Sequence, residues 1–131
     1  MPHLSFEYSA GVEGRVDLPA FAAMLRDAMV ATGIFPLGGI RVRGHRADIA
    51  VVADGGPHDF IDMRLRIGAG REDEAKARAA EMIYEAAETW LQARVGPGGF
   101  ALSFEMIEID PGFSIKRYNT IRNHLQSSEQ T

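Results

Sequence analysis

The sequence predicts an α/β (α+β) fold in which two fused βαβ units form a four-stranded mixed sheet with two helices on one face. Three observations support this prediction. Short segments carry apolar residues at every second position, two longer segments carry them at spacings of three and four, and both halves of the chain show the same order of elements. The helix of a βαβ unit crosses the sheet with right-handed sense, so two tandem units place both helices on the same face.

The first expected helix carries its own start and stop signals. Apolar residues recur at helical spacing from Leu18 to Met29, after a segment, 4–8, whose alternation predicts a strand. Asp17 is a candidate N-cap, and Pro19 fits the first turn because its missing N–H breaks no helical bond. Gly33 is well placed to end the helix.

A long strand is expected next, from Ile40 to about Val52, with Gly44 as a bulge or kink. A strand of that length places apolar residues such as Val51 and Val52 on the face of the sheet that the helices leave open. Because an exposed apolar patch of this kind is typical of an interface, the pattern predicts burial against other subunits.

The second half repeats the order of the first. Residues 60–67 alternate as a strand, 72–94 carry a helical stripe, and 102–106 alternate again. Even the dipeptide Pro2-His3 is echoed by Pro57-His58. We therefore expect a single domain, 1–131, made of one βαβ unit at 2–56, a second at 57–110 and a C-terminal arm at 111–131.

Composition excludes several functional classes. The chain of 131 residues is 46% hydrophobic and 24% charged, which is ordinary for a globular domain. No apolar run approaches the roughly 20 residues that cross a bilayer, and no signal peptide is recognisable, so a cytoplasmic protein without a membrane partner is expected. A formal net charge of −4 argues against nucleic-acid binding. There is no cysteine and the histidines are scattered, so no metal site is expected.

Pro2 is the first candidate for chemistry. Removal of Met1 exposes a secondary amine on a rigid ring at the start of a strand. An α-amino group titrates near 8, so about a tenth of it is unprotonated at pH 7, and lowering its pKa by one unit makes about half of it available as a base. Apolar surroundings and nearby cations act in that direction. Pro57 is internal and has no amine, so one site per chain is expected.

The second candidate set is a group of arginines beside glycine-marked turns. Arg41 and Arg43 follow Gly38-Gly39 and share one face of their strand, and Arg71 closes a Gly-Ala-Gly turn. Guanidinium groups bind carboxylates through paired hydrogen bonds, so these residues indicate an anionic ligand. Salt-bridged surface arginines are the structural alternative for each. The turn at Arg71 lacks the spacing of nucleotide-binding loops. Cations of the arm, Lys116, Arg117 and Arg122, either meet acids of a neighbouring subunit or keep the arm soluble.

Several blocks together resemble one family, the 5-carboxymethyl-2-hydroxymuconate isomerases of the tautomerase superfamily. The blocks are Met-Pro-His at the start, 31–37 (ATGIFPL), 39–41 (GIR), 68–71 (GAGR) and 101–105 (ALSFE), and the resemblance runs from Pro2 to about Leu125. Members of the superfamily are βαβ proteins with an amino-terminal proline, and members of this family are homotrimers. The resemblance therefore implies a tautomerase-like fold, here with two fused units, and a homotrimer that covers the open sheet faces.

The resemblance also implies an activity. A cofactor-free isomerase of homoprotocatechuate (4-hydroxyphenylacetate) breakdown converts 5-carboxymethyl-2-hydroxymuconate, a small polycarboxylate, to its 2-oxo isomer. Pro2 matches the family's general base, while Arg41 and Arg71 match positions that hold substrate carboxylates and the developing 2-oxo oxygen; Arg43 is a further candidate for substrate binding. Two alternatives stay open: a broader keto-enol tautomerase or hydratase-like relative acting on another acid, and a trimeric module that binds carboxylates without reaction.

Overall fold

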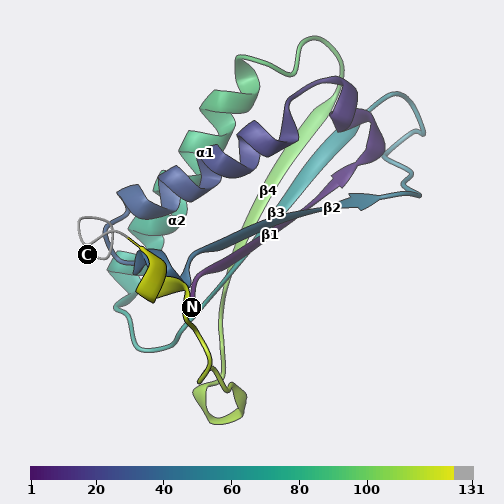
Figure 1. Cartoon of the computed structure of the whole chain (residues 1–131). Coiled ribbons are helices and arrows are strands. Elements are labelled where there is room, and N and C mark those ends of the chain that lie inside the picture. Colours follow the sequence, from purple (N-terminus) through teal and green to yellow (C-terminus); the bar gives the residue numbers. More distant parts are fainter. Residues whose placement is uncertain (126–131) are drawn as a thin grey trace.

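The computed structural model describes residues 1–125, in which one sheet carries two long helices (Figure 1). Short 3-10 turns occupy 10–14, 37–39, 111–113 and 121–124. The strands and helices are β1 (His3–Ser9), α1 (Leu18–Ala31), β2 (Arg41–Ala47), β3 (Asp59–Ile67), α2 (Asp73–Gln92) and β4 (Phe100–Glu108).

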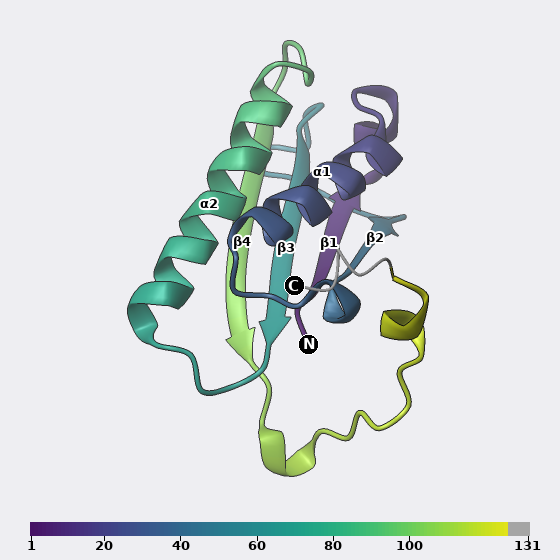
Figure 2. The ribbon, with the colours of Figure 1, turned by 60° about the vertical axis from the view of Figure 1, so that its left-hand side comes forward.

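The sheet is mixed, with the strand order β2-β1-β3-β4. β1 is parallel to β2 and β3 is parallel to β4, while β1 and β3 are antiparallel in the centre. Both helices lie on the same face of the sheet (Figure 2). This arrangement confirms the predicted fold class, because each half contributes a parallel strand pair joined by a helix and the halves meet through their first strands.

The local signals around α1 act as predicted. The Asp17 carboxylate accepts a hydrogen bond from the backbone N–H of Ala20 at 3.1 Å, and Pro19 lies in the first turn. Gly33 follows the helix with φ of +76°, a left-handed conformation that glycine adopts without a steric penalty. The ends of α1 are therefore determined by local sequence.

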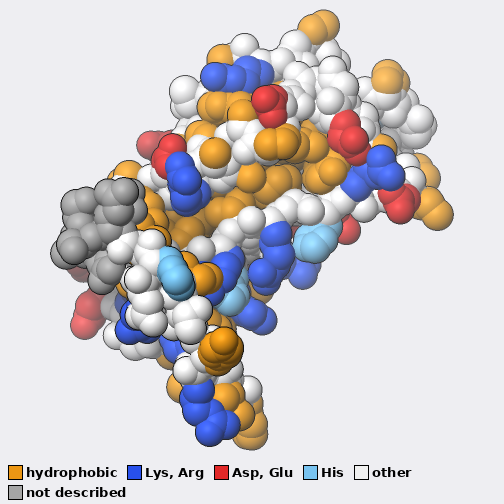
Figure 3. All heavy atoms as spheres, viewed as in Figure 1, with side chains coloured by type: hydrophobic (Ala, Val, Ile, Leu, Met, Phe, Trp, Pro, Cys, Tyr) orange, Lys and Arg blue, Asp and Glu red, His pale blue; other side chains and the backbone are white. Residues whose placement is uncertain are grey.

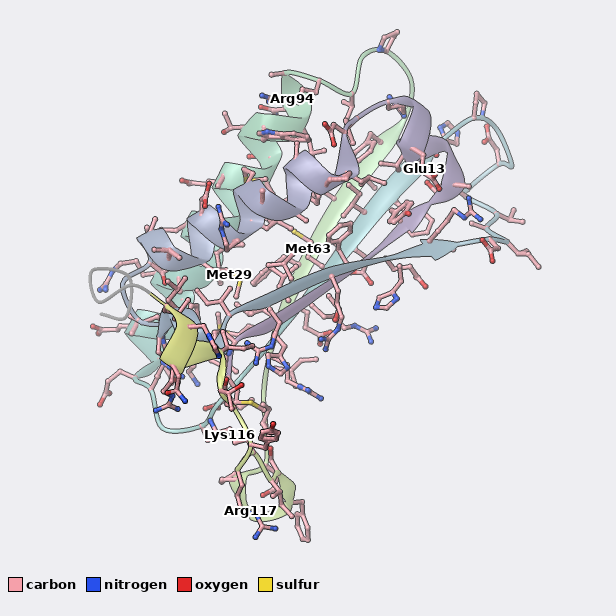
Figure 4. All side chains as sticks on the ribbon, viewed as in Figure 1. Glu13, Met29, Met63, Arg94, Lys116 and Arg117 are labelled. Carbon is pink, nitrogen blue, oxygen red and sulfur yellow. The ribbon has the colours of Figure 1, made fainter. Side chains whose placement is uncertain are left out.

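The core fills the space between the sheet and the helices. Met29 of α1 and Met63 of β3 point into this space from opposite sides (Figure 4), and both are fully buried. Phe21 packs edge-on against Phe6, with ring centroids 5.1 Å apart. The buried set also includes Leu4, Leu25, Ile61, Leu65, Ile67 and Ile83.

The predicted strand from Ile40 to Val52 is wrong in its extent. β2 ends at Ala47, which pairs with Ser9, the last residue of β1, and the chain beyond has no neighbouring strand to bond with. Gly44 is not a bulge either, because the register continues through it opposite Phe6. A β-carbon at Gly44 would lie 2.5 Å from the Phe6 ring, so the glycine makes room for an aromatic side chain.

The open face of the sheet is polar, which corrects the prediction of an apolar one. Val51 and Val52 lie in the loop after β2 and not on a strand. Because side chains alternate along a strand, the residues between the core positions project to the open face, and basic side chains gather there beside histidine (Figure 3). They include His3, Arg41, Arg43, His45, Arg64 and Arg66.

The C-terminal arm leaves β4 and returns toward the start of the chain (Figure 2). The Asn119 side-chain amide donates a hydrogen bond to the Gly38 carbonyl at 3.3 Å, and a β-carbon on Gly38 would lie 3.3 Å from Cβ of Arg122. The arm thus packs against the turn before β2. None of the helices in residues 1–125 is long and apolar enough to cross a membrane. The end of the predicted arm, 126–131, lies outside the described residues.

Candidate active site

The Pro2 ring is buried at the amino end of β1. The turn before β2 and the C-terminal arm lie at the same end of the sheet. The Pro2 carbonyl accepts a hydrogen bond from the N–H of Arg41 at 3.1 Å, which extends the pairing of β1 with β2 by one step. A β-carbon on Gly39 would lie only 3.3 Å from Cδ of Pro2. The Gly38-Gly39 turn therefore lets the backbone lie directly against the proline ring, which fixes the start of the chain.

A cavity of about 470 Å³ opens beside this terminus, between the turn before β2 and the C-terminal arm. Its lining includes Met1, His3, Arg41, Lys116 and Tyr118. Among the described residues that line it, several are basic and none is acidic. The cavity is therefore suited to a small anion, although the chain as a whole carries a formal net charge of −4.

Of the three arginines predicted for the site, only Arg41 lines this cavity, together with Arg122 of the arm. Nη1 of Arg41 donates to the carbonyls of Gly38 at 3.0 Å and of Ile40 at 3.2 Å, so the guanidinium is held against the turn. A fixed planar guanidinium is well suited to carboxylate binding, because little side-chain freedom is lost on binding.

Arg71 and Arg43 approach the terminus without lining the cavity. Arg71 donates to the carbonyls of Ile34 at 3.0 Å and Gly68 at 3.4 Å, and its guanidinium lies 5.1 Å from the centre of the Phe35 ring. Arg43 is exposed and lies opposite Ser5, one pair beyond His3 on the open face. The structure therefore brings Arg71 near the amine from the side of β3, and Arg43 near His3.

The environment of the α-amine favours its neutral form. The pKa of the amine at Met1 is lowered from 8.0 to about 6, first by burial, then by the charges of Lys116, Arg71 and Arg41. Figure 4 shows Lys116 on the extended part of the arm that passes the start of the sheet, with Arg117 farther out at the tip of the arm. A pKa near 6 leaves most of such an amine unprotonated at pH 7, which is the state that a general base requires.

His3 carries the second perturbed group at this end of the sheet. Burial and the charges of Arg43, Arg41 and Arg66 lower the pKa of His3 from 6.5 to about 4, so its ring is neutral at physiological pH. Its Nδ1 lies 3.4 Å from Nη2 of Arg66, which faces it across the antiparallel β1 and β3 pair. His3 therefore lies between the cavity, which it lines, and the arginines Arg43 and Arg66 of the open face.

The opposite end of the sheet, where β1 ends and β3 begins, contains a corresponding arginine in a different setting. Arg15 follows β1 as Arg71 follows β3, and it lies 5.4 Å from the Phe100 ring centre. Its Nη1, however, is 3.2 Å from a carboxylate oxygen of Asp59. That carboxylate neutralises the guanidinium, and the nitrogen of Pro57, before β3, is part of an amide, so this end of the sheet lacks both the unpaired cation and the amine.

Sequence reasoning missed His3, Arg66 and Lys116. Scattered histidines carried no metal-ligand spacing, and the arm cations were assigned to solubility or to a neighbouring subunit. The pairing of His3 with Arg66 depends on the register of two antiparallel strands, and the position of Lys116 depends on the path of the arm. The signals that directed attention to this end of β1 were the amino-terminal Pro2 and Arg41 after the glycine turn, and neither identified these three residues.

Comparisons with known proteins identify the family of the chain. The family model for 5-carboxymethyl-2-hydroxymuconate isomerase matches residues 2–125. The chain is 41% identical over 121 residues to the 5-carboxymethyl-2-hydroxymuconate Delta-isomerase of Escherichia coli, covering 91% of this chain and 95% of that protein. A crystal structure of a 5-carboxymethyl-2-hydroxymuconate delta-isomerase superposes with a TM-score of 0.83 at 28% identity, covering 97% of this chain and 94% of the other.

A more distant solved structure extends the comparison. The fused 4-OT called W0, a wild-type symmetric trimer, superposes with a TM-score of 0.65 at 25% identity and covers 90% of this chain and 96% of its own. Fold, matched residues and sequence identity all agree, so the chain belongs to the family of 5-carboxymethyl-2-hydroxymuconate isomerases, within the tautomerase superfamily.

Proposed function

We propose that the protein isomerises 5-carboxymethyl-2-hydroxymuconate to its 2-oxo isomer and that the Pro2 amine, exposed by removal of Met1, is the general base. The observation that carries this proposal is the position of the amino terminus beside a cavity lined by cations, where burial and the charges of Lys116, Arg71 and Arg41 lower the pKa of the Met1 amine to about 6; the Pro2 amine, one residue along, is proposed to experience the same lowering of its pKa. An amine with this pKa is mostly neutral at pH 7 and still basic enough to take a proton from an enol.

The reaction needs one proton to move within the substrate. The Pro2 nitrogen takes the proton of the 2-hydroxyl, the C2–O bond becomes a carbonyl, and the double bonds shift along the conjugated chain. The same amine then returns the proton to carbon at the far end of the conjugated system, so atoms and charge balance without a co-reactant. No metal, flavin or nucleotide takes part in this scheme.

The cations have two tasks in this scheme. Arg41 lines the cavity and is proposed to bind a substrate carboxylate, with Arg71 and Arg43 as further contributors to binding. Their charges also stabilise the oxyanion that develops at C2, and such stabilisation is worth several kcal/mol at oxyanion sites in general. We further propose a homotrimer, on the basis of the symmetric trimer among the structural relatives, and a cytoplasmic location, on the basis of the composition of the sequence.

An ultraviolet assay with 5-carboxymethyl-2-hydroxymuconate tests the proposal. We expect Pro2→Ala to lower turnover by orders of magnitude, because the primary amine that replaces the ring has a different basicity and position. Intact-mass analysis of active enzyme must show that Met1 is absent. Retained Met1 in fully active protein, or unchanged turnover of Pro2→Ala, contradicts the assignment of the base.

Substrate choice separates this function from the broader tautomerase. We expect a preference for 5-carboxymethyl-2-hydroxymuconate over phenylenolpyruvate, and a raised KM for the polyacid in Arg41→Ala. Equal activity on both acids supports the broader tautomerase instead. Saturable binding of the polyacid without proton exchange from deuterated water supports the non-catalytic carboxylate-binding module.

A further inference from the structure

His3 lies beside the proposed base and takes no part in the proton transfer proposed for Pro2. It is the first residue of β1, follows Pro2 directly and lines the same cavity as Met1 and Arg41. Alternation along β1 turns its side chain to the open face, where it is paired with Arg41 of β2 on one side and Arg66 of β3 on the other. The ring is half-buried, so it is accessible to a ligand in the cavity.

The contact with Arg66 determines which nitrogen of the His3 ring carries the proton. Nη2 of Arg66 lies 3.4 Å from Nδ1 of His3. A guanidinium has only donors, so Nδ1 must accept and the single proton of the neutral ring lies on Nε2. Donation from a cation also withdraws electron density from the ring, which strengthens the remaining N–H as a donor.

The surrounding charges keep the ring neutral. The groups that face it are the guanidinium groups of Arg41 and Arg43 on β2, Arg66 on β3, and the amine at the start of the chain. A second positive charge here would compete with protonation of the amine, which must alternate between its two forms during the reaction. A neutral N–H donor supplies a hydrogen bond without that cost.

We propose that the Nε2–H of His3 donates a hydrogen bond to a substrate carboxylate beside the Pro2 amine, and that Arg66 is a positioning residue that fixes this tautomer. The inference deepens the proposed function and rests on it for the identity of the substrate. His3 thereby joins Arg41 as a specificity-determining group. The two residues lie on adjacent strands, and both donate hydrogen bonds to the same end of the substrate acid.

The kinetic test uses three variants of His3. Gln places an amide N–H where Nε2 lies in histidine, Asn reaches only as far as Nδ1, and Leu removes the donor. Loss of a hydrogen bond to a charged group predicts a fall of about 10- to 100-fold in kcat/KM for His3→Leu and for His3→Asn. His3→Gln should retain activity within a few-fold. His45→Gln, two pairs along on the same face, is the control and should match the wild type.

A second measurement does not depend on turnover. Nitrogen-15 NMR of the free protein should show neutral His3 with the proton on Nε2 at pH 6, and muconate, which lacks the 2-hydroxyl, should shift this resonance. Arg66→Met should raise the pKa of His3 and mix the tautomers, whereas Arg64→Met, on the same face of β3 and next to Glu105, should do neither. The muconate shift should persist in Pro2→Ala.

The outcomes separate the two proposals. A protonated His3 at pH 6, a proton on Nδ1, a resonance that ignores muconate, or full kcat/KM in His3→Leu overturns the role of His3 and leaves the function of Pro2 intact. Lack of any isomerase activity overturns the proposed function, while the NMR measurements still decide whether His3 binds a carboxylate. Circular dichroism of each variant identifies any loss of folding.

Discussion

Lys116 offers the sharpest test of how the site lowers the pKa of its amine. After burial, its charge is the largest cause of the shift in the pKa of the Met1 amine from 8.0 to about 6, ahead of Arg71 and Arg41, and we expect it to act in the same direction on the Pro2 amine. Lys116→Met removes this charge and keeps most of the length and apolar contact of the side chain. We therefore expect the pKa of the amine to rise toward its ordinary value, and the acidic limb of the pH profile to move to higher pH.

The magnitude follows from the fraction of neutral amine. With a pKa of about 6, about nine-tenths of the amine is unprotonated at pH 7; with a pKa of 8, only about a tenth is. Complete loss of the shift therefore lowers kcat/KM at pH 7 by about tenfold. Because burial, Arg71 and Arg41 remain, the fall in Lys116→Met should be smaller than this limit. Above pH 9 the amine is neutral in both proteins, so any difference there reports on substrate binding alone.

The assay is kcat/KM for 5-carboxymethyl-2-hydroxymuconate from pH 5 to pH 10, read by ultraviolet absorbance. Arg117→Met is the matched control, because Arg117 is the next residue and lies farther from the amine (Figure 4). Its acidic limb should coincide with that of the wild type. An acidic limb that stays in place in Lys116→Met, or that moves equally in Arg117→Met, refutes the assignment of the shift to this lysine.

Two further predictions concern stability, measured by urea unfolding. Gly44→Ala should lower the free energy of unfolding by about 1–3 kcal/mol, because its new methyl group meets the Phe6 ring, whereas Gly14→Ala, with open space around it, should not. Equal stability of the two variants would contradict the close packing on Gly44. Asp17→Ala should cost about 1 kcal/mol through loss of the bond to the Ala20 N–H, and Asp17→Asn should recover most of it; an effect of the same size in both would exclude the cap as the cause.

Much of the fold was predictable because it depends on local patterns. The alternation at 4–8 identified the buried face of β1, and the signals at Asp17, Pro19 and Gly33 identified the ends of α1. These features need only the period of a helix or a strand and the bonding needs of a helix end. The arrangement of four strands and two helices then followed from the repeated order of elements.

The wrong predictions concern features of β2 that depend on residues distant in the sequence. The strand after α1 was predicted to reach Val52, but it ends at Ala47 because β1, its partner, ends at Ser9. Gly44 was interpreted as a bulge, although the ring that it accommodates belongs to Phe6, on another strand. A residue pattern read along the chain does not show where a neighbouring strand stops or which side chain it places opposite.

The candidate site likewise has features that follow from local sequence and features that depend on tertiary contacts. The sequence alone determined the candidate amine and the arginines, because glycine turns and the family resemblance are local or linear signals. Only the tertiary structure decided that Arg41 lines the cavity while Arg71 and Arg43 do not, that the arm brings Lys116 to the amine, and that His3 meets Arg66. Electrostatic effects on a pKa fall off with distance in space, and those distances are established only when the strands pair and the arm returns across the start of the sheet.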